Sequence, residues 1–71
     1  MKRVTLKAAE RVFRSHYPKA RIEGYTGNDR KRYYLVHKDN VRGEFHVGEG
    51  DTKPKAWRDA CERLNITEAK S

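Results

Sequence analysis

The side chains best suited to chemistry in this sequence are basic, and their spacing places several of them together. Lys7, Arg11 and Arg14 follow the three- and four-residue spacing of one helix face, and would lie within about 60° of one another. Only Glu10 interrupts this basic face. A cluster of cations favours binding to a polyanion, although a merely solvated helix face has the same composition.

Two further basic groups accompany the ends of other predicted elements. The run from Arg30 to Arg32 falls where the loop between two predicted strands ends and the second of these strands begins. Lys53 and Lys55 stand at the start of a predicted helix, where the backbone amides and the helix dipole favour an anion. The predicted nucleic-acid-binding residues are therefore Lys7, Arg11, Arg14, Arg30, Lys31, Arg32, Lys53 and Lys55.

Residues with catalytic potential are few, and their spacing does not match a metal site or an acid–base pair. The histidines and the single cysteine have no zinc-like spacing, and Cys61 falls on the apolar side of its predicted helix. The carboxylates are interspersed with bases, so no acid–base pair stands out, and the segment 48–50 is too short for a nucleotide-binding loop. We therefore predict no enzymatic activity, no metal and no cofactor.

Length and composition indicate one small basic domain over residues 1–71, with a short polar tail at about 67–71. The formal net charge is +7, and residues 1–21 alone hold seven basic side chains and one acidic one. A single cysteine allows no internal disulfide, and no apolar run suggests a signal peptide or a membrane span. We expect a cytoplasmic protein that does not bind membranes.

Hydrophobic periodicity predicts the elements that position these residues. A helix over 5–17 would be capped by Thr5 and ended by Pro18, with Leu6 and His16 on or beside its buried face. A second helix over 53–64 would be capped by Thr52, bury Trp57 and end at Asn65.

Three strands are predicted between the helices, at 20–26, 31–38 and 41–47. A tight turn at 39–40 would pair Tyr34 with Phe45 and Val36 with Gly43, with Val47 on the same face. The predicted fold class is α+β, with the order α-β-β-β-α, a three-stranded antiparallel sheet and two helices packed on one face. The opposite, open face would hold Tyr33, Leu35, His37, Arg42, Glu44 and His46.

The segment from Gly48 to Ala60 resembles the double-stranded RNA-binding domain, which has the same order of elements. The glycine-rich approach to the second helix and its spaced alanines match the family at Gly48, Gly50, Thr52, Lys53, Ala56 and Ala60. The chain departs from the family at Pro54 and Trp57, and it lacks the family's glycine-proline-any-histidine signature between the first two strands. The resemblance implies that the first helix lies along a minor groove of duplex RNA while Lys53 meets phosphates across the neighbouring major groove.

The sequence thus predicts a non-enzymatic domain that binds the backbone of duplex RNA or DNA through a basic helix face. Two alternatives remain open. Tyr33, His37 and His46, with Tyr25, could instead stack unpaired bases. The pair Ala56-Trp57 also loosely resembles the last helix of small basic phage accessory proteins, which implies a partner protein with an acidic surface.

Overall fold

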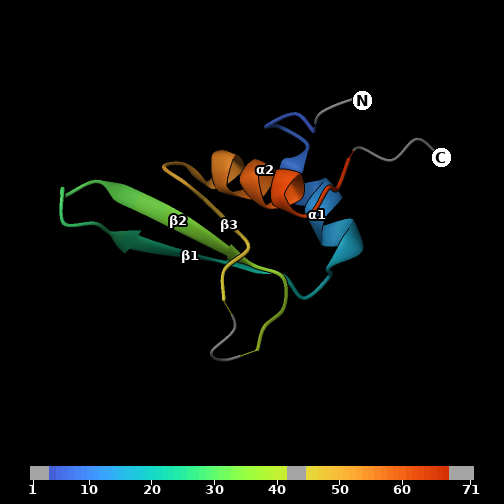
Figure 1. Ribbon diagram of the computed structural model, residues 1–71, viewed down its shortest axis with the longest axis horizontal. Helices are drawn as coiled ribbons and strands as arrows, with labels where there is room; N and C mark the ends of the chain where they lie inside the picture. The colour runs from blue at the N-terminus through green and yellow to red at the C-terminus, as the bar shows by residue number, and fades with distance from the viewer. Residues whose placement is uncertain (1–3, 42–44, 68–71) are drawn as a thin grey trace.

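The fold has the predicted order of one helix, three antiparallel strands and a second helix (Figure 1). The computed structural model describes residues 4–41 and 45–67. The elements are α1 (Ala9–His16), β1 (Arg21–Thr26), β2 (Arg32–His37), β3 (Gly48–Gly50) and α2 (Lys53–Arg63). The predicted α+β class is confirmed.

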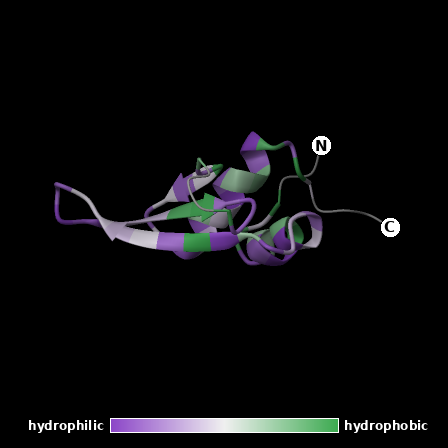
Figure 2. Cartoon of the chain, turned by 90° about the horizontal axis from the view of Figure 1, so that it is seen from below, coloured by the Kyte–Doolittle hydropathy of each residue, from purple (hydrophilic) through white to green (hydrophobic). Residues whose placement is uncertain are grey.

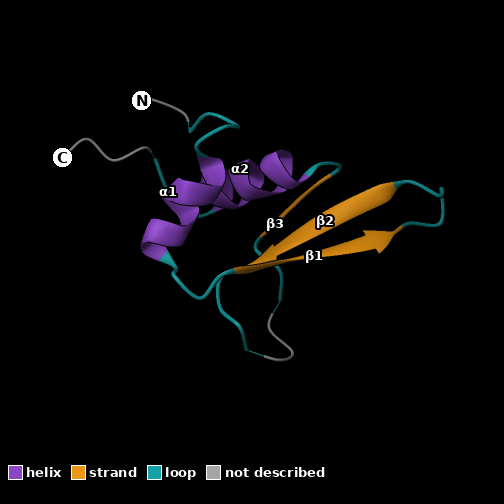
Figure 3. Cartoon of the chain, turned by 180° about the vertical axis from the view of Figure 1, so that it is seen from behind, coloured by secondary structure: helices purple, strands orange, loops and turns teal. Residues whose placement is uncertain are grey.

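The sheet has the order β1-β2-β3, and both strand pairs are antiparallel. β1 pairs with β2 along its whole length, whereas β3 pairs with β2 only from Tyr34 to Val36. Beyond Tyr34 the hairpin is a two-stranded ribbon in the described residues, and it projects away from the helices (Figures 1 and 3). We call residues 25–33 the arm.

The core lies where the two helices meet the sheet. α2 packs against β3 and β2, and α1 packs mainly against α2. The Phe13 ring contacts the rings of Tyr17 and Trp57, with centroids 5.1 and 5.6 Å apart, and Trp57 is buried as predicted. Hydrophobic residues gather in this part of the chain, while the loop at the arm's end is hydrophilic (Figure 2).

The first helix is shorter than predicted, because the chain makes a turn before α1 begins. Thr5 does act as a local cap, since its Oγ accepts a hydrogen bond of 3.2 Å from the Ala8 amide, but residues 6–8 form a turn. This turn buries Val4 and leaves Leu6 39% exposed. The prediction that Leu6 lies on the buried helix face is therefore wrong, and His16 is also exposed.

The third strand is not where the sequence pattern placed it. β3 is Gly48–Gly50 rather than 41–47, and Tyr34 pairs with Gly50 instead of Phe45. The connection from the end of β2 at His37 to the start of β3 at Gly48 is longer than the predicted tight turn at 39–40, and Phe45 is 88% exposed. Residues 42–44, which include the predicted partner of Val36 and two residues expected on the open face, lie outside the described part of the chain.

The position of β3 follows from close contact between its backbone and α2. A Cβ atom on Gly48 would lie 2.5 Å from the backbone nitrogen of Ala60, and one on Gly50 would lie 2.7 Å from that of Ala56. Glycine in a strand often marks such an approach of another backbone. The glycines and alanines that resemble the double-stranded RNA-binding domain therefore serve to seat α2 on the sheet.

The second helix follows the sequence prediction closely. The Thr52 side chain accepts a hydrogen bond of 3.3 Å from the Lys55 amide, and Pro54 lies in the first turn. Asn65 has a φ of 56°, and the Ile66 amide bonds the Cys61 carbonyl at 2.8 Å, which closes the helix end. In the described ranges, no helix has both the length and the apolar character that a membrane span requires.

Candidate nucleic-acid interface

The tip of the arm is an ordered loop that carries three exposed cations. The Gly27 amide bonds the Lys31 carbonyl at 2.8 Å, and the Arg30 amide bonds the Gly27 carbonyl at 2.9 Å. The Asp29 carboxylate accepts a hydrogen bond of 3.0 Å from the Lys31 amide, and Arg30 takes a left-handed backbone conformation with a φ of 66°. The exposed side chains of Arg30, Lys31 and Arg32 are thereby presented at the end of the ribbon.

Two cations from different elements meet over the ring of Tyr34. The guanidinium of Arg32 lies 5.8 Å from the ring centroid, and the Lys53 ammonium lies 5.9 Å from it. Both distances fall within the range of cation–π attraction. Gly24, which pairs with Tyr34, makes room for Arg32, because a Cβ there would lie 2.8 Å from an arginine Nη atom.

A third cation extends this arrangement to α1. The guanidinium of Arg14 lies 4.9 Å from the centroid of Trp57. Trp57 and Lys53 are one turn apart on α2, so they lie on the same side of that helix. Arg14, Lys53 and Arg32 therefore form one series over two aromatic rings, which joins α1, α2 and β2. We call these three residues the cationic row.

Arg14 is less available than the sequence predicted. Its side chain bonds Glu10 at 2.9 Å and the carbonyl of Ala20 at 2.9 Å, and it is 40% exposed. The expectation that Arg14 is exposed therefore holds only in part, because this side chain also ties the end of α1 to the start of β1. It contributes positive charge to the cationic row, partly offset by Glu10.

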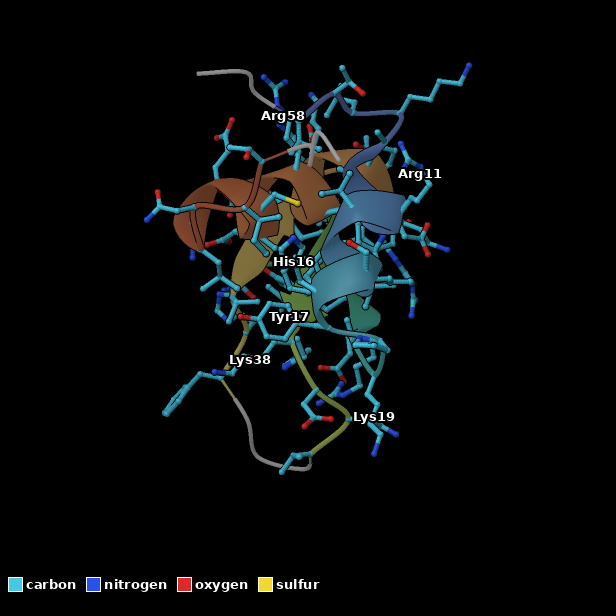
Figure 4. All side chains as sticks on the ribbon, turned by 90° about the vertical axis from the view of Figure 1, so that its right-hand side faces the viewer. Arg11, His16, Tyr17, Lys19, Lys38 and Arg58 are labelled. Carbon is cyan, nitrogen blue, oxygen red and sulfur yellow. The ribbon has the colours of Figure 1, made fainter. Side chains whose placement is uncertain are left out.

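The remaining predicted residues on the helices are not members of the cationic row. Lys7 belongs to the turn before α1, so the expected basic face of three residues does not form on that helix. Arg11 is exposed on the outer side of α1, apart from Arg58 on α2 (Figure 4). Lys55 lies 3.4 Å from Asp51, beside a groove that is also lined by Glu49, Asp59 and Glu62.

The open face of the sheet carries a stacked pair of tyrosines on the arm. Tyr25 and Tyr33 are directly opposite in the strand register, and their ring centroids lie 5.6 Å apart at an interplanar angle of 29°. The Tyr33 hydroxyl donates a hydrogen bond of 2.6 Å to Asp29. This bond lowers the pKa of Asp29, with help from the Lys31 amide, and raises the pKa of Tyr33.

The histidines expected on that face do not extend the stack. His37 is only 5% exposed, and its Nε2 lies 2.7 Å from the carboxylate of Glu23, so its ring is closed to a ligand. His46 lies outside the sheet in the long connection. The Arg21 guanidinium, 3.0 Å from Glu23, and secondarily His37 lower the pKa of that carboxyl.

Among the described residues, no three His, Cys, Asp or Glu side chains are grouped so that they could hold a metal ion. Cys61 is buried, and its thiol lies 3.6 Å from the carbonyl of Ala9. Burial raises the pKa of this thiol to about 11, which disfavours the reactive thiolate.

No protein-family model, curated protein or solved structure matches this chain. The sequence identified the members of the cationic row individually but missed that two aromatic rings bring them together. The one local signal was Gly24, whose missing side chain leaves space beside Arg32.

Proposed function

We propose that this protein is a non-enzymatic nucleic-acid-binding domain that contacts the phosphate backbone of duplex RNA or DNA. The observation that carries the proposal is the cationic row of Arg14, Lys53 and Arg32, which combines charge from three elements. Arg30 and Lys31 continue this positive surface to the tip of the arm. The net charge of +7 adds a long-range attraction for any polyanion.

The chemistry of the row suits phosphates better than small anions. Lysine and arginine that neutralise backbone phosphates release the counterions condensed on the nucleic acid, which favours binding independently of base sequence. The aromatic rings beneath these cations fix their positions without neutralising them. A cytoplasmic location suits a chain whose single, buried cysteine forms no internal disulfide.

A small protein-binding module is the second candidate, and one observation favours it. The connection between β2 and β3 exposes two large apolar side chains, Val41 at 55% and Phe45 at 88%. Exposed apolar residues beside a positive surface would suit a partner protein with an acidic patch.

Fluorescence anisotropy with labelled RNA and DNA duplexes at two salt concentrations tests the proposal. Affinity should fall by roughly 0.9 log units per log unit of salt for each phosphate neutralised on B-DNA. The test variant is Arg32→Gln/Lys53→Gln. Its matched control is Lys19→Gln/Arg63→Gln, which also removes two positive charges but takes them from outside the row.

We expect the row variant to weaken binding to every duplex and to flatten the salt slope by about one for each phosphate that is no longer neutralised. The control should lose only the smaller, long-range share of the attraction. Equal losses in the two variants would contradict a localised interface. Failure of the unmodified protein to bind either duplex at low salt would favour the partner-protein alternative.

A further inference from the structure

The tyrosine pair on the arm lies on the opposite side of the ribbon from the cationic row. Side chains along a strand alternate between faces, so Tyr33 and Tyr34 point to opposite sides of β2. Tyr34 faces α2 and supports Arg32 and Lys53, whereas Tyr33 and its cross-strand partner Tyr25 lie on the open face. The stacked tyrosine pair therefore takes no part in the contacts of the cationic row.

Tyr33 is held in place by several contacts. Its hydroxyl bonds Asp29 at 2.6 Å, and its ring packs against Gly27, where a Cβ atom would lie 2.9 Å from the ring. Tyr25 stacks on the ring held in this way and is itself 42% exposed. A flat aromatic surface is thus kept in a fixed orientation, which lowers the conformational entropy lost when a ligand stacks on it.

The charges around the pair favour an anionic ligand that carries a flat group. Arg30 and Lys31 stand at the end of the same ribbon, three and two residues before Tyr33 in the sequence. The carboxylate of Glu23, which shares the open face, lies 3.0 Å from Arg21 and 2.7 Å from His37. Asp29 accepts hydrogen bonds from the Tyr33 hydroxyl and the Lys31 amide, and its single negative charge is outnumbered by the cations of Arg30 and Lys31 in the same loop.

We infer that Tyr25, supported by Tyr33, is a stacking site for an unpaired nucleobase of a single-stranded nucleic acid. The inference rests on the proposed function, because the cations at the arm's tip would hold the phosphates next to the stacked base. It extends the proposed ligands from duplexes to nucleic acids that carry unpaired nucleotides. Stacking on an aromatic side chain tolerates any base, so no sequence preference is expected from this site.

Comparing the affinity for an oligothymidylate with that for an abasic oligonucleotide of the same length separates the contribution of base stacking from that of backbone charge. Both ligands carry the same backbone charge, but only the first carries bases. The protein should bind the oligothymidylate more tightly, by roughly 5- to 150-fold for one stacked base. Tyr25→Ser should remove most of this difference, and Tyr25→Phe, which keeps the ring, should preserve it.

NMR spectroscopy tests directly whether a base stacks on Tyr25. Titration with the oligothymidylate should shift the ring protons of Tyr25 upfield in NMR spectra, and the abasic ligand should not. Equal affinity of the unmodified protein for the two ligands would overturn the inference, even with duplex binding intact. Failure to bind duplex, oligothymidylate and abasic strand alike would overturn the proposed function as well.

Discussion

The helix-covered end of the molecule and the arm are stabilised by different means. At the helix-covered end, Phe13, Trp57 and Val36 are almost completely buried, and glycines allow β3 to touch α2. In the arm, a ring stack and a few hydrogen bonds around Asp29 maintain an exposed ribbon. The part of the proposed binding surface that the arm carries is therefore largely separate from the buried core, and a substitution in the arm should spare the core.

The largest expected effect on stability comes from removing the Trp57 ring at the helix-covered end. Trp57 is 2% exposed and packs against Phe13, so Trp57→Ala should lower the free energy of unfolding by about 3–5 kcal/mol. Urea denaturation followed by circular dichroism measures this change. A loss no larger than that of Tyr25→Ser would show that the two regions do not differ as described.

Two glycine-to-alanine substitutions compare the helix-covered end with the base of the arm. Gly48→Ala forces a Cβ against the backbone of Ala60 and should cost about 1–3 kcal/mol of unfolding free energy. Gly24→Ala meets only the guanidinium end of Arg32, which can move, so the stability cost should be smaller. Moving Arg32 should nevertheless weaken duplex binding, and the same denaturation and anisotropy measurements report both effects. Equal destabilisation by the two variants would contradict the separation.

These glycines also show why the sequence predicted some elements and not others. The second helix was found because its signals are local, namely the Thr52 cap and the end at Asn65. β3 was missed because Gly48 and Gly50 have low strand propensity, and their strand is set by contact with a distant helix. The alternating apolar pattern through Phe45 looked more like a strand, but that side chain is exposed.

In the candidate site, too, the sequence predicted features that depend on neighbouring residues but not contacts between residues far apart in the chain. Sequence identified Arg32 and Lys53 as basic residues near the ends of elements. It did not place them over one ring, because their common neighbour Tyr34 was assigned to a different strand register. Arg14 was taken as an exposed cation, and only tertiary contacts reveal its bonds to Glu10 and the Ala20 carbonyl.

A near-neutral effect is expected for Phe45→Ser. This side chain is 88% exposed in the connection between β2 and β3, so its replacement should change the unfolding free energy by no more than about 0.5 kcal/mol. If Phe45 paired with Tyr34 in a buried hairpin, the loss would be several times larger. Chemical denaturation of the variant therefore distinguishes the two strand registers, and nucleic-acid binding should be unchanged.

The smallest effect on overall stability is expected at the tip of the arm, where pH provides the probe. The bonds from the Tyr33 hydroxyl and the Lys31 amide hold the pKa of Asp29 below its ordinary value of 3.8. Their contribution is present above that value and is lost as pH falls through the lower pKa of the folded protein. The hydrogen bond to Asp29 also raises the pKa of Tyr33 above 10.0, so its contribution is present below 10.0 and is lost as pH rises through the folded value.

The arm should therefore keep one geometry between these two limits, and NMR titration of the Asp29 carboxyl and the Tyr33 ring should locate them. Asp29→Ala should return the pKa of Tyr33 toward 10.0 and release its ring, because the main cause of the raised value is removed. The melting temperature should hardly change, since the buried contacts of Trp57 remain. A loss of stability in Asp29→Ala as large as the loss in Gly48→Ala would mean that the arm is coupled to the helix-covered end. Tyr25 would then stack on a surface whose orientation depends on the whole fold, and binding could not be altered there without altering stability.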